Sequence, residues 1–285
     1  MYDVIIIGAG PAGYVAALRA GQLGMKTLLI ERGRVGGRAL HAGVVPSKGM
    51  LESARFFRQV MQASHFGVEG LDTQHARFSM RTAMQRSTQV AERMSANIEA
   101  KLEARGVERI RGEAEIASGT SVSVENRVIE GRHIILATGS DTVALPFDMP
   151  AERTATAWTA LSAPEVPERV VVLGTTPVAV EYAELFSMLG STVTIATAMP
   201  GLLPMLGPRL VEAVTRRLES AGVQIITNAG TYSYGNGRLK IGTENAPCDL
   251  VVNCIAERGV LPGGEISLDM AGPFPNVDAY LRTSV

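Results

Sequence analysis

Cysteine is scarce in this chain. Only two are present among 285 residues, Cys248 and Cys254, and their spacing matches neither a CxxC redox motif nor a zinc site. They bracket an apolar run, residues 249–254, of the kind that forms a buried strand. We therefore expect both to be small core residues rather than redox groups or metal ligands.

Strong net charge and long apolar runs are also missing. The formal net charge is −1 at pH 7, which gives no electrostatic reason to bind nucleic acid or an anionic membrane. No apolar run approaches the ~20 residues of a membrane span. Residues 1–3 lead straight into a predicted strand at 4–7, so we expect no signal peptide. With 46% apolar residues, the composition is that of a soluble globular protein. We expect one large or two ordinary domains in the cytoplasm.

The four histidines show no catalytic pattern. His41, His65, His75 and His133 fall in no Ser/His/Asp or metal-binding spacing. We therefore predict no metal site and no catalytic residue belonging to the chain itself. Any chemistry must come from a bound cofactor, for which the protein supplies binding and orientation.

A complete dinucleotide-binding fingerprint opens the chain. Strand Val4–Ile7 leads into a glycine-rich turn and a helix that runs to Gly24, and the next strand ends in Glu31. In this pattern the first glycine makes the turn, the second admits a pyrophosphate and the third lets helix and strand pack. The helix N-terminus attracts the phosphates, and the acid binds the ribose hydroxyls. The residues of the turn and first helical positions are Gly8, Gly10, Pro11, Ala12 and Gly13.

The same unit occurs a second time. A strand, a turn, a helix and another strand are expected at residues 170–173, 174–179, 180–189 and 191–196. From Gly8 to Glu31 the chain advances 23 residues, and from Gly174 to Thr197 it also advances 23. The two copies therefore align without a gap, and their differences can be interpreted position by position.

The second copy has lost key ligand-binding residues. Thr176 stands in place of the second glycine, where a side chain would occupy the space of a pyrophosphate. Thr197, followed by Ala198, stands in place of the ribose acid. Neither a carboxylate for NAD nor an arginine for the NADP phosphate is present. We expect the fold of a nucleotide domain but doubt that NAD(P)H binds tightly.

Between the copies lie other elements. Two amphipathic helices with solvated charged faces are expected at residues 47–66 and 80–104. Strands of a small antiparallel layer are expected at 107–116 and 121–129, and residues 133–140 return to the main sheet. The proline-bearing stretch 141–167 is expected to be the crossover between domains.

Taken together, these motifs resemble the pyridine nucleotide-disulfide oxidoreductases, particularly the dihydrolipoamide dehydrogenase-like members. The resemblance also rests on Gly36-Gly37, Pro46-Ser47-Lys48, Leu136–Gly139 and Tyr280–Ser284. It implies an α/β fold of two Rossmann-like FAD/NAD(P)-binding domains in tandem, of the three-layer ββα type. The expected boundaries are 1–148 for the FAD-binding domain, 149–265 for the NAD(P)-binding-like domain and 266–285 for the truncated start of a return segment.

The resemblance also implies which residues hold FAD. Gly37 and Arg38 would lie near the pyrophosphate, and the backbone of Ala114 near the adenine. Lys48 would reach the flavin ring, where a cation stabilises negative charge. The alternative is a surface helix residue, and the Pro46-Ser47-Lys48 context favours the flavin role. Glu181 would lie near flavin and nicotinamide, or be a solvated helix residue. The full set is Gly8, Gly10, Pro11, Ala12, Gly13, Glu31, Arg32, Gly37, Arg38, Lys48, Ala114, Ala137, Thr138 and Gly139.

Departures from the family pattern limit what can be transferred. The two redox cysteines of the family are Ala39 and Val44 here, which excludes dithiol chemistry at this place. Residues 256–259 replace the usual Gly-Arg-x-Pro, and the sequence stops where relatives continue into a dimerisation domain. We therefore predict an FAD-dependent oxidoreductase or electron-transfer flavoprotein that does not use a dithiol/disulfide. The alternative is a non-catalytic flavin-fold scaffold, or a subunit completed by a partner chain, and we expect a homo-oligomer or a partner polypeptide.

Overall fold

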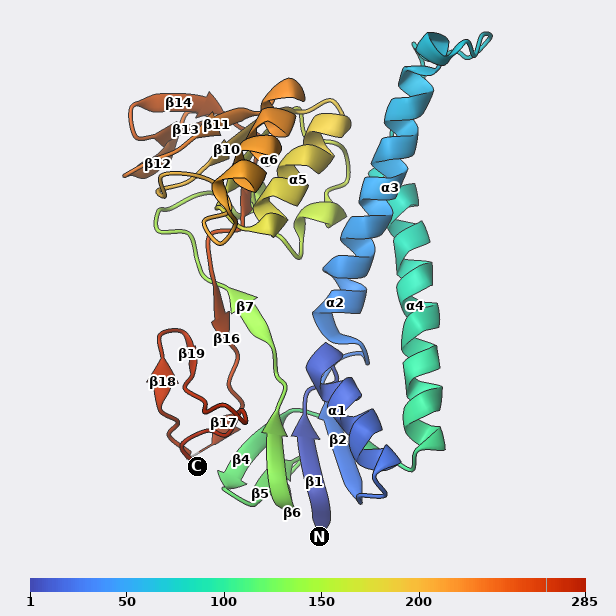
Figure 1. Cartoon of the computed structure of the whole chain (residues 1–285), viewed down its shortest axis with the longest axis vertical. Coiled ribbons are helices and arrows are strands. Elements are labelled where there is room, and N and C mark those ends of the chain that lie inside the picture. The colour runs from blue at the N-terminus through green and yellow to red at the C-terminus, as the bar shows by residue number, and fades with distance from the viewer. Residues whose placement is uncertain (265) are drawn as a thin grey trace. The chain divides into compact units, whose positions relative to one another are not determined.

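The computed structural model describes residues 1–264 and 266–285, which divide into two compact units. The first unit comprises Met1–Val45, Thr88–Asp141 and Glu257–Val285, and the second comprises Pro46–Ser87 and Thr142–Ala256. Each unit contains a parallel sheet with helices (Figure 1). The predicted α/β class with two Rossmann-like folds is confirmed.

The main sheet of the first unit is parallel. Strand β1 (Tyr2–Ile7) lies between β2 (Thr27–Glu31) and β6 (Arg127–Leu136), and β3 (Glu108–Arg111) pairs with the outer edge of β2. Ile5 and Ile6 point to opposite faces of β1, and both are fully buried. This explains the continuous run of β-branched residues, because a strand covered on both faces has no solvent side. Helix α1 (Pro11–Gln22) follows β1 directly.

An antiparallel layer joins this sheet. Strand β4 (Ala114–Ser118) pairs with β5 (Ser121–Val124), and β5 pairs with the first half of β6. The prediction that residues 107–116 form a single strand of this layer is wrong, because β3 belongs to the parallel sheet. The N–H group of Gly112 donates to the carbonyl of Glu31 at 3.0 Å, and the chain leaves the parallel ladder at this point.

Short elements complete the first unit. Helix α2 (Gly37–His41) follows β2, and strands β7 (Ser140–Thr142) and β16 (Glu257–Gly259) form a two-stranded sheet. Strand β17 (Gly263–Gly264) pairs with β4. The remaining pair is the hairpin of β18 (Met270–Ala271) and β19 (Phe274–Pro275).

Two long helices connect segments of both units. Helix α4 (Met80–Ala104) has the predicted bounds, whereas α3 (Val44–Met61) begins earlier than predicted and is followed by the 3-10 turn η1 (Ala63–Phe66). Pro46 stands in the first turn of α3, where its missing N–H costs no hydrogen bond. Residues 46–87 belong to the second unit, because the apolar side chains of Met50, Ala54 and Met80 pack in its core.

The second unit repeats the strand–turn–helix arrangement. Its sheet has the order β11-β10-β9-β15-β8 and is parallel. The strands are β8 (Thr154–Thr156), β9 (Arg169–Leu173), β10 (Thr192–Ala196), β11 (Gln224–Ile226) and β15 (Leu250–Asn253). Helices α5 (Pro177–Met188) and α6 (Pro208–Ser220) follow β9 and β10. Residues 141–167 are more than the predicted crossover, because they contain β8 and the 3-10 turns η2 (Ala151–Arg153) and η3 (Ala160–Ser162).

An antiparallel sheet also belongs to the second unit. Its strands are β12 (Tyr232–Gly235), β13 (Arg238–Ile241) and β14 (Glu244–Pro247). Leu239 and Ile241 of β13 are buried against Val171 and Val251 of the parallel sheet. The second unit therefore has the same combination of a parallel and an antiparallel sheet as the first.

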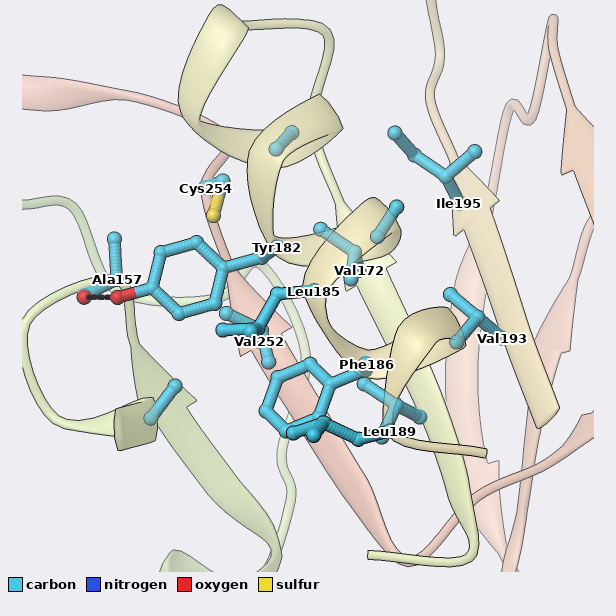
Figure 2. Close-up of a cluster of buried hydrophobic side chains, with 14 of the residues drawn as sticks. Ala157, Val172, Tyr182, Leu185, Phe186, Leu189, Val193, Ile195, Val252 and Cys254 are labelled. Atoms are coloured by element: carbon cyan, nitrogen blue, oxygen red, sulfur yellow. Dashed lines mark hydrogen bonds between the residues drawn. The ribbon is translucent and has the colours of Figure 1, made fainter. Parts of the chain in front are cut away.

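Aromatic side chains of α5 anchor the core of the second unit. Tyr182 and Phe186 lie among aliphatic side chains that include Val172 and Val252 (Figure 2). The Tyr182 hydroxyl donates to the carbonyl of Ala157, which satisfies its one polar group. Burial raises the pKa of this phenol, so it stays neutral.

Both cysteines are core residues, as predicted. Cys248 and Cys254 flank β15, are buried and form no disulfide. Burial raises the pKa of the Cys248 thiol, which lowers its reactivity. Within the described part of the chain, no helix has both the length and the apolar character needed to cross a bilayer.

Candidate functional site

The glycine turn after β1 leaves no room for side chains at two of its positions. A Cβ atom on Gly8, which has a φ of +101°, would lie 2.3 Å from the carbonyl oxygen of Ala137. A Cβ on Gly13 would lie 1.7 Å from the oxygen of Gly8. The first and third glycines therefore have the predicted jobs of turning the chain and letting α1 approach β1.

The second glycine is different, because no described residue requires it. No atom of the part of the chain that the structure describes lies within 4 Å of a Cβ placed on Gly10. Gly10 is the N-cap of α1 and offers no side-chain cap. The first intrahelical bond runs from the N–H of Tyr14 to Gly10, so the N–H groups of Ala12 and Gly13 precede it. This end of α1 therefore presents backbone donors and a positive dipole to an anion.

A second glycine turn packs against the first. The N–H group of Gly36 donates to Ala9 at 2.8 Å, and a Cβ on Gly37 would lie 2.8 Å from the Cα of Gly10. Arg38, the next residue, pairs with the carboxylate of Asp141 at 2.8 Å and donates to the carbonyl of Ser140. Gly37 thus lies beside the glycine turn that follows β1, while Ser140 and Asp141 of β7 hold the Arg38 guanidinium. The approach of both residues to a pyrophosphate stays a prediction.

The acid at the end of β2 faces the same turn. Glu31 accepts hydrogen bonds from the N–H of Ala9 at 2.6 Å and from that of Gly33 at 2.7 Å. A carboxylate has about four lone-pair sites. The two contacts orient Glu31 and leave acceptor capacity for a ligand hydroxyl.

These residues meet in one cleft of the first unit. Its cavity volume is about 70 Å³ and it opens to solvent, so the cleft encloses less space than the roughly 300–1,000 Å³ of a typical small-molecule pocket. Five predicted cofactor residues line it: Gly8, Glu31, Arg32, Ala114 and Thr138. The Arg32 side chain forms an exposed ion pair with Glu113 at 2.9 Å.

One wall of the cleft was missed by the sequence analysis. Val260, Leu261 and Pro262 line it together with the predicted residues. The N–H of Val260 donates to Gly139 at 2.9 Å, and the Thr138 hydroxyl donates to the carbonyl of Val260. The only sequence feature that pointed to this wall was the departure of residues 256–259 from the family pattern. We interpreted that departure solely as the loss of a motif.

Lys48 lies in the second unit, with Glu181. The Lys48 ammonium on α3 donates to one carboxylate oxygen of Glu181 on α5. The Glu181 side chain is only 19% exposed, and its other oxygen, Oε1, is buried with no hydrogen-bond partner among the residues that the structure describes. The interpretation of Glu181 as a solvated helix residue is therefore wrong. Lys48 is half exposed, and its approach to a flavin ring stays a prediction.

The positions of the missing disulfide hold aliphatic side chains. Ala39 lies in α2 and is half-buried, and Val44 begins α3 and is exposed. Among the described residues, no group of three His, Cys, Asp or Glu side chains could hold a metal ion.

Known proteins share this arrangement. The sequence profile of the pyridine nucleotide-disulphide oxidoreductases matches residues 2–285. Dihydrolipoyl dehydrogenase of Acholeplasma laidlawii is 29% identical over 100% of this chain and 87% of its own length. Dihydrolipoyl dehydrogenase of Chlorobaculum tepidum is 31% identical over 99% of this chain. The chain spans 64% of the latter protein and 64% of the homologue from Pseudomonas aeruginosa.

Solved structures show the same fold. The HOCl-induced flavoprotein disulfide reductase RclA from Escherichia coli superimposes with a TM-score of 0.82 at 24% identity, covering 99% of this chain and 64% of that one. LpdA from Mycobacterium tuberculosis gives a TM-score of 0.77 at 23% identity, covering 90% and 59%. The sequence match over nearly the whole chain makes the assignment predicted from the motifs secure: the chain belongs to the pyridine nucleotide-disulphide oxidoreductase family.

Proposed function

We propose that this chain binds FAD in its first unit and acts as a flavin-dependent oxidoreductase or electron-transfer flavoprotein without dithiol/disulfide exchange. One observation carries the proposal. Gly10 faces open space at the uncapped end of α1, beside a cleft lined by Glu31 and Ala114. The fold alone does not require glycine there, whereas a pyrophosphate lying against the backbone does.

Each part of the cofactor has a matching group. The N-terminus of α1 and the turn at Gly37 would take the pyrophosphate, since both supply backbone at close approach. Glu31 would accept from the ribose hydroxyls, and the cleft wall at Ala114 and Val260 would hold the adenine. Ala137, Thr138 and Gly139 would close over the cofactor, with Thr138 fixed by its bond to Val260.

Bound FAD would supply the ability to take up and release electron pairs, which no side chain of this protein has. The resemblance to the family suggests Lys48 as a cation near the flavin ring, and this stays a prediction. A cation close to the ring stabilises negative charge there. The buried Oε1 atom of Glu181 has room to accept one further hydrogen bond.

The proposal that the reaction uses no dithiol rests on the number and location of the cysteines. Ala39 and Val44 occupy the family's cysteine positions, and the two cysteines present are buried on either side of β15. A thiol–disulfide exchange needs an accessible thiolate. Electrons would therefore pass directly between the flavin and its reaction partners.

A polypeptide partner or a second copy of the chain forms part of the proposal. Residues 127–130 of β6 pair with β5, and the second half of β6 pairs with β1. On its other edge, residues 132–136 pair with no strand of the described chain. An open edge of this kind presents unpaired backbone groups and accepts an added strand. The cytoplasmic location predicted from the sequence stays a prediction.

The test is reconstitution with FAD followed by gel filtration and an absorption spectrum. We expect a flavin band that co-elutes with the chain and bleaches on photochemical reduction. A Gly10→Val variant should elute as folded protein without flavin. Absence of flavin from the wild-type chain would refute the redox proposal and leave the non-catalytic scaffold. Bound flavin in Gly10→Val would contradict the placement of the pyrophosphate.

A further inference from the structure

The glycine turns of the two units have nearly identical surroundings. A Cβ on Gly8 would lie 2.3 Å from the oxygen of Ala137, and a Cβ on Gly174 would lie 2.3 Å from the oxygen of Cys254. Both glycines have positive φ, +101° and +138°. Each turn is thus held against a neighbouring strand end in the same way. The second unit has kept the backbone of a dinucleotide-binding turn.

The first turn of the following helix differs. In α1 the N-cap is Gly10, which has no side chain. In α5 the N-cap is Thr176, whose hydroxyl accepts a hydrogen bond from the backbone N–H of Ala179 at 3.3 Å. This N–H is one of the few that a bound phosphate could use. The Thr176 side chain therefore stands where a ligand oxygen would stand in the first unit.

Other polar groups around the second turn also have partners within the protein. The carbonyl of Thr175 accepts from the N–H of Leu203 at 2.9 Å. The Thr197 hydroxyl accepts from the N–H of Met199 at 3.0 Å. Thr197 and Leu203 are almost fully buried, at 4% and 3% exposure. These hydrogen bonds hold the segment that follows β10 against the glycine turn of the second unit.

The same segment carries no charge. Residues 197–207 contain no Asp, Glu, Lys or Arg. A dinucleotide would meet neither a carboxylate for its ribose hydroxyls nor a cation for a ribose phosphate. The residues of the second unit therefore do not fit NAD(P)H, although the backbone frame does.

We infer that Thr176 is the residue that closes the second unit to nicotinamide dinucleotides, by capping α5 with its own hydroxyl. One side chain blocks the phosphate position of this turn, while the backbone fold of the unit is kept. The inference goes beyond the proposed function, because it concerns a different unit and does not depend on FAD. It also means that the flavin takes its electrons from a donor other than NAD(P)H bound at this turn.

The test is calorimetric titration of NADH and NADPH into the wild-type chain, Thr176→Gly and Thr176→Ser. Serine keeps the capping hydroxyl, so Thr176→Ser is the matched control. Glycine opens the turn and is itself an acceptable N-cap, so Thr176→Gly should remain folded. A thermal melt of each variant checks this.

We expect wild type and Thr176→Ser to bind neither dinucleotide detectably. Thr176→Gly should bind NADH measurably, at least about tenfold more tightly than the weakest binding that the titration detects, because an N–H group becomes available to a charged phosphate. Micromolar binding by the wild type would overturn the inference, and so would equal affinities of the glycine and serine variants. FAD content, measured separately, keeps this outcome distinct from failure of the flavin proposal.

Discussion

The Glu31 carboxylate accepts a hydrogen bond from the backbone N–H of Ala9 at 2.6 Å. This contact joins the end of β2 to the glycine turn after β1. It fixes the acid beside the turn before any ligand arrives, so that the proposed ribose-binding group and the proposed phosphate-binding turn form one preorganised unit.

Replacing this acid should affect both stability and cofactor binding. Glu31→Ala removes the acceptor of the Ala9 N–H and of any ribose hydroxyl. We expect a lower melting temperature even without FAD, and FAD affinity reduced about tenfold or more, as for hydrogen bonds to a charged group. Melting curves and FAD titrations measure the two effects. Arg216→Ala, which breaks an exposed pair with Glu212 on α6, is the control and should change neither. An unaltered FAD affinity in Glu31→Ala would exclude the acid from the site.

Two glycines of one turn should respond differently to the same substitution. Gly13→Ala places a methyl group 1.7 Å from the oxygen of Gly8 and should destabilise the fold by about 2 kcal/mol or more. Gly10→Ala meets no protein atom within 4 Å, so its melting temperature should stay close to that of wild type while FAD affinity falls. Chemical denaturation and FAD titration separate the cases. Equal losses of stability would mean that Gly10 has a purely structural role.

Thiol accessibility tests whether sulfur takes part in the chemistry. The native chain should react with no equivalents of a thiol reagent on the minute scale, because both cysteines are buried and burial raises the pKa of the Cys248 thiol. In denaturant, two thiols should react. Alkylation of the native protein should leave flavin reduction unchanged. A fast-reacting thiol whose modification stops flavin turnover would contradict the disulfide-free proposal.

An ion pair at the edge of the second unit should give a recognisable pH dependence. Asp249 binds the Arg169 guanidinium through both carboxylate oxygens, at 2.6 and 2.9 Å. The hydrogen bond from Arg169 lowers the pKa of the Asp249 carboxyl below its ordinary value, which is about 3.9. A lowered pKa means that the stabilisation is present above about pH 4 and is lost as the pH falls through the folded-state pKa.

Asp249→Asn should therefore lower the melting temperature near neutral pH, and the difference from wild type should shrink as the pH drops below about 4. Melting curves across this range measure it. A difference that is constant with pH would show that the carboxylate charge contributes nothing. Asp278→Asn, which removes a carboxylate from the exposed chain end near Arg282, is the control and should leave the melting temperature of the second unit unchanged.

The local parts of the fold could be predicted from the sequence. Val4–Ile7, the glycine turn and Glu31 are consecutive signals of one supersecondary unit, and each glycine has a steric reason. The repeat at Gly174 could be predicted for the same reason. The stretch 107–116 was predicted as one strand because Gly112 is its only sequence sign that the chain leaves β3 and passes to β4 in another part of the sheet.

The long-range contacts could not be predicted. Thr138 bonds to Val260, 122 residues away, and Lys48 pairs with Glu181, 133 residues away. No local periodicity links such positions. The resemblance to the family suggested both Lys48 and Glu181. Val260–Pro262 follow directly after residues 256–259, where the family motif is lost, so neither motif nor pattern pointed to the cleft wall.

FAD binding by the first unit is the central claim, and one measurement tests it most directly. The purified chain is incubated with FAD, freed of unbound cofactor and examined by visible absorption, then titrated anaerobically with NADH and afterwards with dithionite. The account predicts a bound flavin band that NADH leaves unchanged and dithionite bleaches. A chain that retains no flavin would contradict the proposed function. A flavin that NADH bleaches would contradict the closure of the second unit by Thr176.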